Sequence, residues 1–571
     1  MNPQRIGVYV CWCGSNIAKI VDVEKVARVM ARIPGVEVSR EYKYMCSDPG
    51  QELIMKDIKE LGLDRVVVAS CSPRMHEPTF RKTLKLAGLN PYMLEMANIR
   101  EHVSWVHENQ ELATAKAINL TRAAVHRVMV HAPLVQHEVP VNRATMVLGG
   151  GITGMTAALR IAGQGRKVYL VERSDELGGR AIGVGRAGPH MNSVAALLDN
   201  LTTRVNDSAY IDVLTGTVVG EVSGFVGNFL VRLANGTREL TVGAIVVATG
   251  TQPFDAKKLH RSGYGRFPNV VTSTQFEEMA ASGRFTTESG KAPRRVAIIH
   301  CVGSRDSETH SYCSRTCCMD ALRFSNILRD ALPDAAIYQA YSDMRAFGRD
   351  AEEFYARTAE RDVTFLLFDK LLPPTVSEAP AGDPYPLLVT MDEIATGIAI
   401  EVPADLVVLM VAREACSDAK DVAKLVSISV DKDGFFIEKH PKLDPAATTT
   451  DGIYIAGSCQ GPKDIPDCMS QAGATAARVL AAITMGKVKV PATTATVNED
   501  LCVGCQTCIS VCPYGAVIYL DKHRVSRVEE VICKGCGTCA AACPAGTISP
   551  RHFTDNQVLQ QLEGLLAAEE G

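Results

Sequence analysis

Eight cysteines toward the end of the chain repeat one spacing, CxxCxxCxxxCP, in "CVGCQTCISVCP" and "CKGCGTCAAACP". Thiolates at this spacing hold two [4Fe–4S] clusters, and the fourth cysteine of each run ligates the cluster of the other run. Zinc is the alternative, but a tetrahedral zinc site needs only four thiolates. The doubled run therefore favours a pair of electron-transfer clusters. We predict one cluster on Cys502, Cys505, Cys508 and Cys543, and the other on Cys533, Cys536, Cys539 and Cys512.

A second group of cysteines lies in "HCVGSRDSETHSYCSRTCC", which contains Cys301, Cys313, Cys317 and Cys318. This spacing is neither a common zinc spacing nor a common ferredoxin spacing. Four thiolates converging on one point match one [4Fe–4S] cluster, which is the prediction here. A redox disulfide between Cys313 and Cys317, or cysteines that only pack in the core, are the alternatives.

A glycine-rich turn in "ATMVLGGGITGMTAALRIAGQGRKVYLVER" points to dinucleotide binding. An apolar strand, a GxGxxG turn made by Gly149, Gly151 and Gly154, a helix and a second strand ending at Glu172 follow one another. Such glycines let a pyrophosphate approach the helix N-terminus, and the acid accepts a hydrogen bond from a ribose hydroxyl. The order of these elements makes the motif more specific than the glycines alone.

The following segments favour FAD as the dinucleotide. "LGGR" at 177–180, "AIVVATG" at 244–250 and "DGIYIAGSCQGPKDIPDCMSQAGATAARVLAAITMG" resemble the flavin domain of thioredoxin-reductase-like flavoproteins. In that arrangement the last helix points its positive end at the flavin ring. Ser458 stands where an acidic residue is usual, and Asp467 is either a flavin contact or a helix cap. The further predicted FAD contacts are Arg173, Gly179, Arg180, Thr249, Gly250, Gly457, Ser458, Lys463 and Asp464.

A second nucleotide loop is expected in such flavoproteins after the strand "RRVAIIHCVGSRD". Only Gly303 of its glycines is present, and Cys301 lies in the loop. Without the other glycines the backbone cannot approach a pyrophosphate in the usual way. We therefore predict a degenerate second nucleotide domain that carries the cysteine site.

The N-terminal region has cysteines at strand ends. Cys11 and Cys13 follow "RIGVYV", Cys71 ends "DRVVVAS", and Cys46 lies in "YMCSDPG". In a parallel sheet the carboxyl ends of strands share one edge, so these thiols can meet there. A metal or iron–sulfur site and ordinary buried cysteines are both open.

Composition bounds the remaining possibilities. The chain has 571 residues, 46% apolar and 22% charged, with a net charge of −4 and 19 cysteines. This balance indicates a globular protein and argues against nucleic-acid binding. No apolar run is long enough to span a membrane, and clustered cysteines favour metal over disulfides, so we expect a cytoplasmic protein.

The motifs divide the chain into an α/β fold with appended modules. We expect a thioredoxin-reductase-like FAD-binding Rossmann core, an N-terminal α/β domain, and a C-terminal α+β two-cluster ferredoxin domain. The predicted ranges are an N-terminal domain at 1–140, FAD-binding parts at 141–290 and 401–490, the degenerate domain at 291–400, the ferredoxin domain at 491–550 and a docking helix at 551–571.

Five stretches together resemble one family. "CVGSRD", "YCSRTCC", "SDMRAFGRDAEEFY", "AGSCQGPKDIPD" and "VVVASCSPRMHEPTF" are similar to the heterodisulfide reductase HdrA family, which supplies the flavin protein of electron-bifurcating complexes found in methanogenesis. The resemblance implies a [4Fe–4S] cluster near FAD on Cys301, Cys313, Cys317 and Cys318, and a cluster in the N-terminal domain. Methanogenic members carry a further two-cluster insert after LGGR, whereas residues 181–244 here contain no cysteine.

The resemblance implies an oxidoreductase subunit that couples two-electron flavin chemistry to the reduction of ferredoxin and of a disulfide or similar acceptor. The partners it implies are B- and C-like subunits, ferredoxin, and a hydrogenase, formate dehydrogenase or NADH-linked input protein, around a homodimer. The alternatives are a non-bifurcating carrier like those of quinone-interacting oxidoreductase complexes, a stand-alone NAD(P)H:disulfide oxidoreductase, and a mainly scaffolding protein. The degraded second loop argues against the NAD(P)H enzyme.

Overall fold

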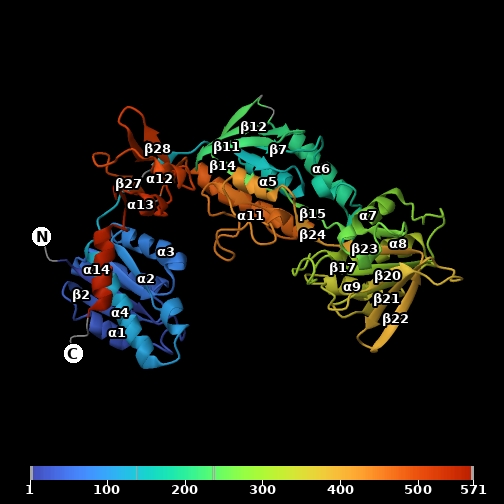
Figure 1. Ribbon diagram of the computed structural model, residues 1–571, viewed down its shortest axis with the longest axis horizontal. Coiled ribbons are helices and arrows are strands. Elements are labelled where there is room, and N and C mark those ends of the chain that lie inside the picture. The colour runs from blue at the N-terminus through green and yellow to red at the C-terminus, as the bar shows by residue number, and fades with distance from the viewer. Residues whose placement is uncertain (1–3, 137, 235, 237, 491, 568–571) are drawn as a thin grey trace. The chain divides into compact units, whose positions relative to one another are not determined.

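The computed structural model describes residues 4–136, 138–234, 236, 238–490 and 492–567. The chain forms two compact units, Met1–Glu138 with Lys489–Gly571, and Val139–Val488. The second unit therefore interrupts the first in sequence (Figure 1).

The second unit contains two parallel sheets. The first has the order β10-β7-β6-β14-β25. Its strands are nearly continuous apolar runs, as expected for a parallel sheet covered on both faces. Helix α5 (Ile152–Ala162) packs against α11 (Ile465–Thr484), and α6 (Val194–Asn206) packs against α5. The strands are β6 (Thr145–Leu148), β7 (Val168–Val171), β10 (Ile211–Leu214), β14 (Ala244–Val247) and β25 (Ile453–Ile455).

The second parallel sheet has the order β16-β23-β17-β18-β19 and lies in the sequence between β14 and β25. Helices α7 (Ser273–Ser282), α8 (Cys317–Ala331) and α9 (Ala351–Ala359) accompany it. The short β15 (Thr251–Pro253) pairs with β24 (Arg413–Ala415), so the chain enters and leaves this part side by side. The strands are β16 (Val270–Thr272), β17 (Arg295–Val302), β18 (Ala336–Tyr341), β19 (Val363–Leu367) and β23 (Leu406–Val411).

Each parallel sheet carries a small antiparallel sheet. The first has β11 (Val219–Phe225), β12 (Asn228–Leu233) and β13 (Glu239–Val242), and α10 (Ala419–Leu425) contacts β11. The other has β20 (Thr375–Glu378), β21 (Leu387–Glu393) and β22 (Ile398–Ala404). Two Rossmann-type sheets joined by a two-stranded connection are the predicted core.

The first unit begins with a parallel sheet of order β2-β1-β3-β4, in which β1 and β3 are almost fully buried. Helix α4 packs against β3 and β4 of this sheet. The strands are β1 (Ile6–Cys11), β2 (Val36–Tyr42), β3 (Arg65–Ser70) and β4 (Leu94–Asn98). The helices are α1 (Val23–Met30), α2 (Asp48–Leu61), α3 (Pro73–Leu86) and α4 (Gln110–Met129).

The C-terminal cysteine-rich module in this unit is small. It has two strand pairs, β27 (Ala495–Val497) with β30 (Ile548–Pro550), and β28 (Val517–Leu520) with β29 (Val525–Val528). Two short helices, α12 (Thr507–Ser510) and α13 (Thr538–Ala542), contact each other. The two-fold repeat of cysteine spacing thus becomes a two-fold repeat of strand and helix.

The last helix, α14 (Asp555–Leu566), packs lengthwise on α4 (Figure 1). Thr554 and Gln557 form a reciprocal capping box that starts it. Gly564 allows the close approach, because an added Cβ would lie 2.8 Å from the His126 ring. The predicted tail helix is thus a packing element of this unit, over the part of residues 551–571 that the structure describes.

Candidate flavin site and cysteine clusters

The glycine turn after β6 has the geometry that a dinucleotide requires. Gly149 has a φ of +112°, and an added Cβ would lie 2.4 Å from the Ala248 carbonyl oxygen. A Cβ at Gly154 would lie 1.8 Å from the Gly149 carbonyl oxygen. Gly151 is the N-cap of α5. The turn therefore has no room for side chains, and it presents the positive end of a helix to the space above it.

Glu172 is fixed at the end of β7 beside this turn. Its Oε2 accepts the Gly150 N–H at 2.6 Å and its Oε1 accepts the Ser174 N–H at 2.8 Å. The carboxylate is 8% exposed and keeps further lone pairs for a ligand hydroxyl. This is the position that the sequence predicts for a ribose contact.

A cavity of about 940 Å³ opens above the turn. All predicted FAD contacts line this cavity except Gly154 and Gly457. Gly457 has a φ of +80°, and an added Cβ would lie 2.4 Å from Thr153 Oγ1. The residues that line it are Gly149, Gly151, Glu172, Arg173, Gly179, Arg180, Thr249, Gly250, Ser458, Lys463 and Asp464.

The cavity also carries the positive charge of Arg413, which no sequence motif marks. Burial lowers the pKa of Arg180, and the neighbouring Arg413 lowers it further. Two neighbouring guanidinium groups suit a bound anion, since the attraction of the anion to both offsets their mutual repulsion. Arg413 lies 233 residues after Arg180 in a strand with no nucleotide motif, so sequence reasoning missed it. The donor set fits the phosphates of FAD.

The second half of the flavin segment forms the expected helix, but the N-cap of this helix is not Asp467. Helix α11 starts at the N-cap Asp464, whose Oδ1 accepts the Asp467 N–H at 2.8 Å. The alternative that Asp467 caps this helix is therefore wrong, because Asp464 does so. Asp467 instead forms an ion pair with Arg315 at 2.7 Å. Lys463 is held by the carbonyl of Gly457, and burial lowers its pKa.

The degenerate second loop is blocked by an aromatic side chain. Gly303 has a φ of +82°, and an added Cβ would lie 2.4 Å from the Phe254 ring. Phe254 is 2% exposed and contacts the His310 ring edge-on. The space next to this glycine is therefore filled by protein, and the loss of nucleotide binding there stays a prediction.

Three of the four thiols in this loop lie together. Cys301 ends β17, and Cys317 and Cys318 begin α8. The Cys317 thiol lies within hydrogen-bonding reach of Cys301 and of Cys318, and these contacts raise its own pKa. The same contacts lower the pKa of Cys301 to about 7 and that of Cys318 to about 4.

Cys313 belongs to the same group through Arg345. Arg345 donates to the Cys313 thiol and, from its backbone, to Cys318. Cys313 Sγ also accepts the Arg315 N–H at 3.3 Å. The structure thus brings all four predicted cysteines into one neighbourhood.

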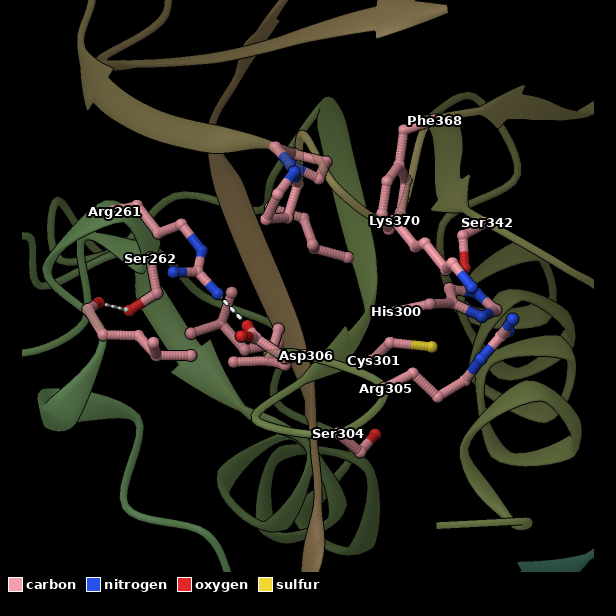
Figure 2. Close-up of a pocket in the computed structure, with 16 residues that line it drawn as sticks. Arg261, Ser262, His300, Cys301, Ser304, Arg305, Asp306, Ser342, Phe368 and Lys370 are labelled. Carbon is pink, nitrogen blue, oxygen red and sulfur yellow. Dashed lines mark hydrogen bonds and ion pairs between the residues drawn. The ribbon is translucent and has the colours of Figure 1, made fainter. Parts of the chain in front are cut away.

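The backbone around this group is strained in a way that marks a site. Cys301, Arg305 and Arg315 have φ values of +59°, +54° and +61°. Such values in non-glycine residues cost roughly 1–3 kcal/mol each and cluster at functional sites. Ser304 Oγ and Arg305 Nη1 are buried without a hydrogen-bond partner in the described chain. Figure 2 shows Cys301 with His300 and Arg305 among the residues that line a cavity. Its volume is about 30 Å³, and Cys313, Cys317 and Cys318 are not part of its lining. Free donors of this kind fit the sulfides of a cluster.

The C-terminal module pairs its cysteines crosswise. A small cavity is lined by Cys512 together with Cys533, Cys536 and Cys539. Cys505 interacts electrostatically with Cys543 of the other run. Backbone N–H groups reach the sulfurs, for example Ala516 N to Cys512 Sγ at 3.3 Å. Both pairings are those that the spacing predicts, although ligation itself stays a prediction.

The N-terminal cysteines gather at one sheet edge, as expected. Cys13 has a φ of +50°, and its N–H donates to Cys11 Sγ at 3.3 Å. Burial raises the pKa of Cys11, of Cys46 and of Cys71, the last to about 11. Arg100 Nη1 contacts Cys13 Sγ at 3.5 Å from a π-helix, Arg100–Ser104. π-Turns are rare and frequent at functional sites. Sequence reasoning missed Arg100, which no motif marks.

No three His, Cys, Asp or Glu side chains in the described ranges lie close enough to hold a single metal ion. The remaining cysteines are buried thiols, and burial raises the pKa of Cys459 to about 12. Within the same ranges, every helix is too short or too polar to cross a bilayer.

Two family descriptions match the chain. Residues 145–288 match "FAD dependent oxidoreductase", and residues 501–552 match "4Fe-4S dicluster domain". These matches and the observed sheets confirm the predicted fold class, and they make the protein an oxidoreductase that carries FAD and [4Fe–4S] clusters. Solved thioredoxin reductases are also similar. That of T. acidophilum is 16% identical with a TM-score of 0.41, covering 60% of this chain and 100% of that one.

Closer relatives extend over the whole chain. The A subunit of H(2):CoB-CoM heterodisulfide,ferredoxin reductase from Methanothermobacter marburgensis is 38% identical, covering 99% of this chain and 98% of that relative. The A subunit of H(2)/formate:CoB-CoM heterodisulfide,ferredoxin reductase from Methanococcus maripaludis is 37% identical, covering 100% and 99%. These alignments run over 652 and 656 positions, whereas this chain has 571 residues, so both relatives contain sequence that it lacks.

Proposed function

The chain belongs to the heterodisulfide reductase HdrA family, and on that premise we propose that it is the bifurcating flavin protein of a heterodisulfide reductase-like complex. In this role it divides electron pairs between two one-electron routes. One route runs through a cluster on Cys301, Cys313, Cys317 and Cys318. The other leaves through the C-terminal module or through clusters of a separate protein, because residues 181–244 contain no cysteine.

One observation carries this proposal. The flavin cavity is lined both by the glycine turn and by Arg315 and Thr316 of the cysteine loop. In a pyridine-nucleotide enzyme of this architecture, the flavin would instead face a hydride donor. Bound FAD supplies the chemistry that exchanges an electron pair as two single electrons, which clusters accept one at a time.

The residues around the cavity perform binding and charge compensation. Gly149, Gly151 and the start of α5 receive the pyrophosphate, and Glu172 receives the ribose. Arg180 and Arg413 offset the phosphate charge. The N-terminal end of α11 presents a positive dipole to the flavin cavity, which stabilises negative charge there. Phe254 packs against Gly303, and we propose that this contact closes the second nucleotide loop.

The N-terminal cysteines Cys11, Cys13, Cys46 and Cys71 are proposed to hold a further cluster, supported by Arg100. The proposed partners are B- and C-like subunits, ferredoxin, and an input protein. The names of the relatives include H2, formate and ferredoxin. A homodimer within the complex is proposed on the family resemblance.

A potentiometric titration of the flavin in the native complex tests the proposal. Bifurcation requires crossed one-electron potentials, so the flavin absorbance is expected to bleach in a single two-electron step. Two resolved one-electron steps would favour the non-bifurcating alternative and overturn the proposal. Co-purification with a quinone-reactive membrane protein would point the same way.

A further inference from the structure

Arg315 belongs to the cysteine loop through its backbone. It lies between Cys313 and Cys317, and its N–H donates to Cys313 Sγ at 3.3 Å. Its φ of +61° is unusual for a residue with a side chain. This conformation is kept although a glycine would adopt it more easily.

The side chain crosses from the cysteine loop to the flavin segment. Arg315 Nη2 lies 2.7 Å from Asp467 Oδ2 in the first turn of α11. The guanidinium also lies over the Phe347 ring, at 5.3 Å from its centre. Arg315 lines the flavin cavity, as do Pro466 and Cys468 on either side of Asp467. One ion pair thus connects the loop of the proposed cluster with the helix that points at the flavin.

Stability does not explain this pair. The Arg315 and Asp467 side chains are 38% and 46% exposed. Ion pairs with this exposure contribute little to folding. Their charges nevertheless act over the few ångströms that separate them from the cysteine loop and the cavity, because screening by salt takes about 10 Å at ordinary ionic strength.

We propose that the Arg315–Asp467 ion pair sets the electron-exchange equilibrium between the flavin and the cluster of Cys301, Cys313, Cys317 and Cys318. This inference rests on the proposed function, since it requires a cluster in that loop. Each electron that arrives adds a negative charge, which Arg315 stabilises and Asp467 destabilises. Arg315 belongs to the cysteine loop, and Asp467 belongs to the helix that points at the flavin. The ion pair therefore favours the electron on the cluster over the electron on the flavin. Both are positioning residues, and neither transfers an electron itself.

The test compares charge removal on either side of the pair. Arg315→Gln removes the positive charge of the pair and keeps the negative one, so it is expected to lower the midpoint potential of the cluster. Asp467→Asn removes the negative charge and keeps the positive one, so it is expected to raise the midpoint potential of the cluster. In each case the expected change in the one-electron reduction equilibrium of the cluster is about tenfold, which shifts its midpoint potential by about 59 mV. Arg315→Lys keeps the charge and is expected to retain the original value.

The measurement is EPR-monitored titration of the holo-protein, with iron and FAD contents determined on every sample. Arg478 and Asp444 form a matched control pair at 2.7 Å, with Arg478 on the same helix and both residues outside the cavity lining. Arg478→Gln is expected to leave the potentials unchanged. If Arg315→Gln loses iron, Asp467→Asn, which leaves the loop intact, decides the question alone.

Shifts of the same sign in both variants, or unchanged potentials with full iron and FAD, would overturn the inference. A merely structural role would lower cofactor content without moving the potential in opposite directions. Absence of any EPR signal from this loop in the unsubstituted protein would instead overturn the proposed function, and the inference with it.

Discussion

A Cys317→Ser variant is expected to contain about four fewer iron atoms per chain, the content of one [4Fe–4S] cluster. Cys317 is 4% exposed at the start of α8, and its thiol contacts both Cys301 and Cys318. A serine hydroxyl is a far poorer ligand for iron than a thiolate. Iron and acid-labile sulfide analysis of the purified protein measures the loss.

The matched control for this variant is Cys459→Ser. Cys459 is equally buried, but it donates to the backbone carbonyls of Val247 and Ala456, as a serine also can. Its replacement is expected to leave the iron content unchanged. Undiminished iron in Cys317→Ser would rule out this cysteine as a ligand, and equal losses in both variants would show only that buried cysteines are needed for folding.

A Gly154→Ala variant is expected to lose FAD affinity by about 100-fold, or about 2.8 kcal/mol. Alanine normally improves a helix by up to about 1 kcal/mol over glycine. Here its Cβ would lie 1.8 Å from the Gly149 carbonyl oxygen. The clash outweighs the gain in helix propensity, because the whole turn that receives the pyrophosphate has to move. Titration of the apo-protein with FAD, followed by flavin fluorescence, gives the affinity.

Gly473→Ala in α11 is the control, since a Cβ there meets nothing within 4 Å. Its FAD affinity is expected to equal that of the unsubstituted protein. An unchanged affinity in Gly154→Ala would mean that the glycine turn is not where the pyrophosphate binds.

The motifs with fixed spacing could be predicted from the sequence because local geometry determines them. The glycine turn follows directly from Gly149, Gly151 and Gly154. The crosswise relation of Cys512 with the second cysteine run follows from the CxxCxxCxxxCP repeat, and a single cavity collects these cysteines.

Long-range partners could not be predicted from spacing. Asp467 pairs with Arg315 across 152 residues of sequence, and no periodicity reports such a contact. The sequence offered Asp467 as a flavin contact or as the cap of α11, whereas the hydrogen bond from the Asp467 N–H assigns the cap to Asp464. Arg413 and Arg100 lie in no motif, so their charges become meaningful only when the fold brings them to the cavity and to the N-terminal cysteines. The charged residues that act on the site from other parts of the chain could therefore not be identified from the sequence alone.

The central claim is that single electrons pass between the flavin and the cysteine loop from Cys301 to Cys318. Laser-flash photoreduction of the flavin in the holo-protein tests it most directly, with absorbance followed in time and samples frozen for EPR. In the unsubstituted protein the flavin absorbance is expected to recover while a [4Fe–4S] signal appears. In Cys317→Ser with full FAD, recovery is expected to slow by about tenfold or more, equivalent to about 1.4 kcal/mol of barrier. Equal recovery rates with the same EPR signal in both proteins would contradict the claim.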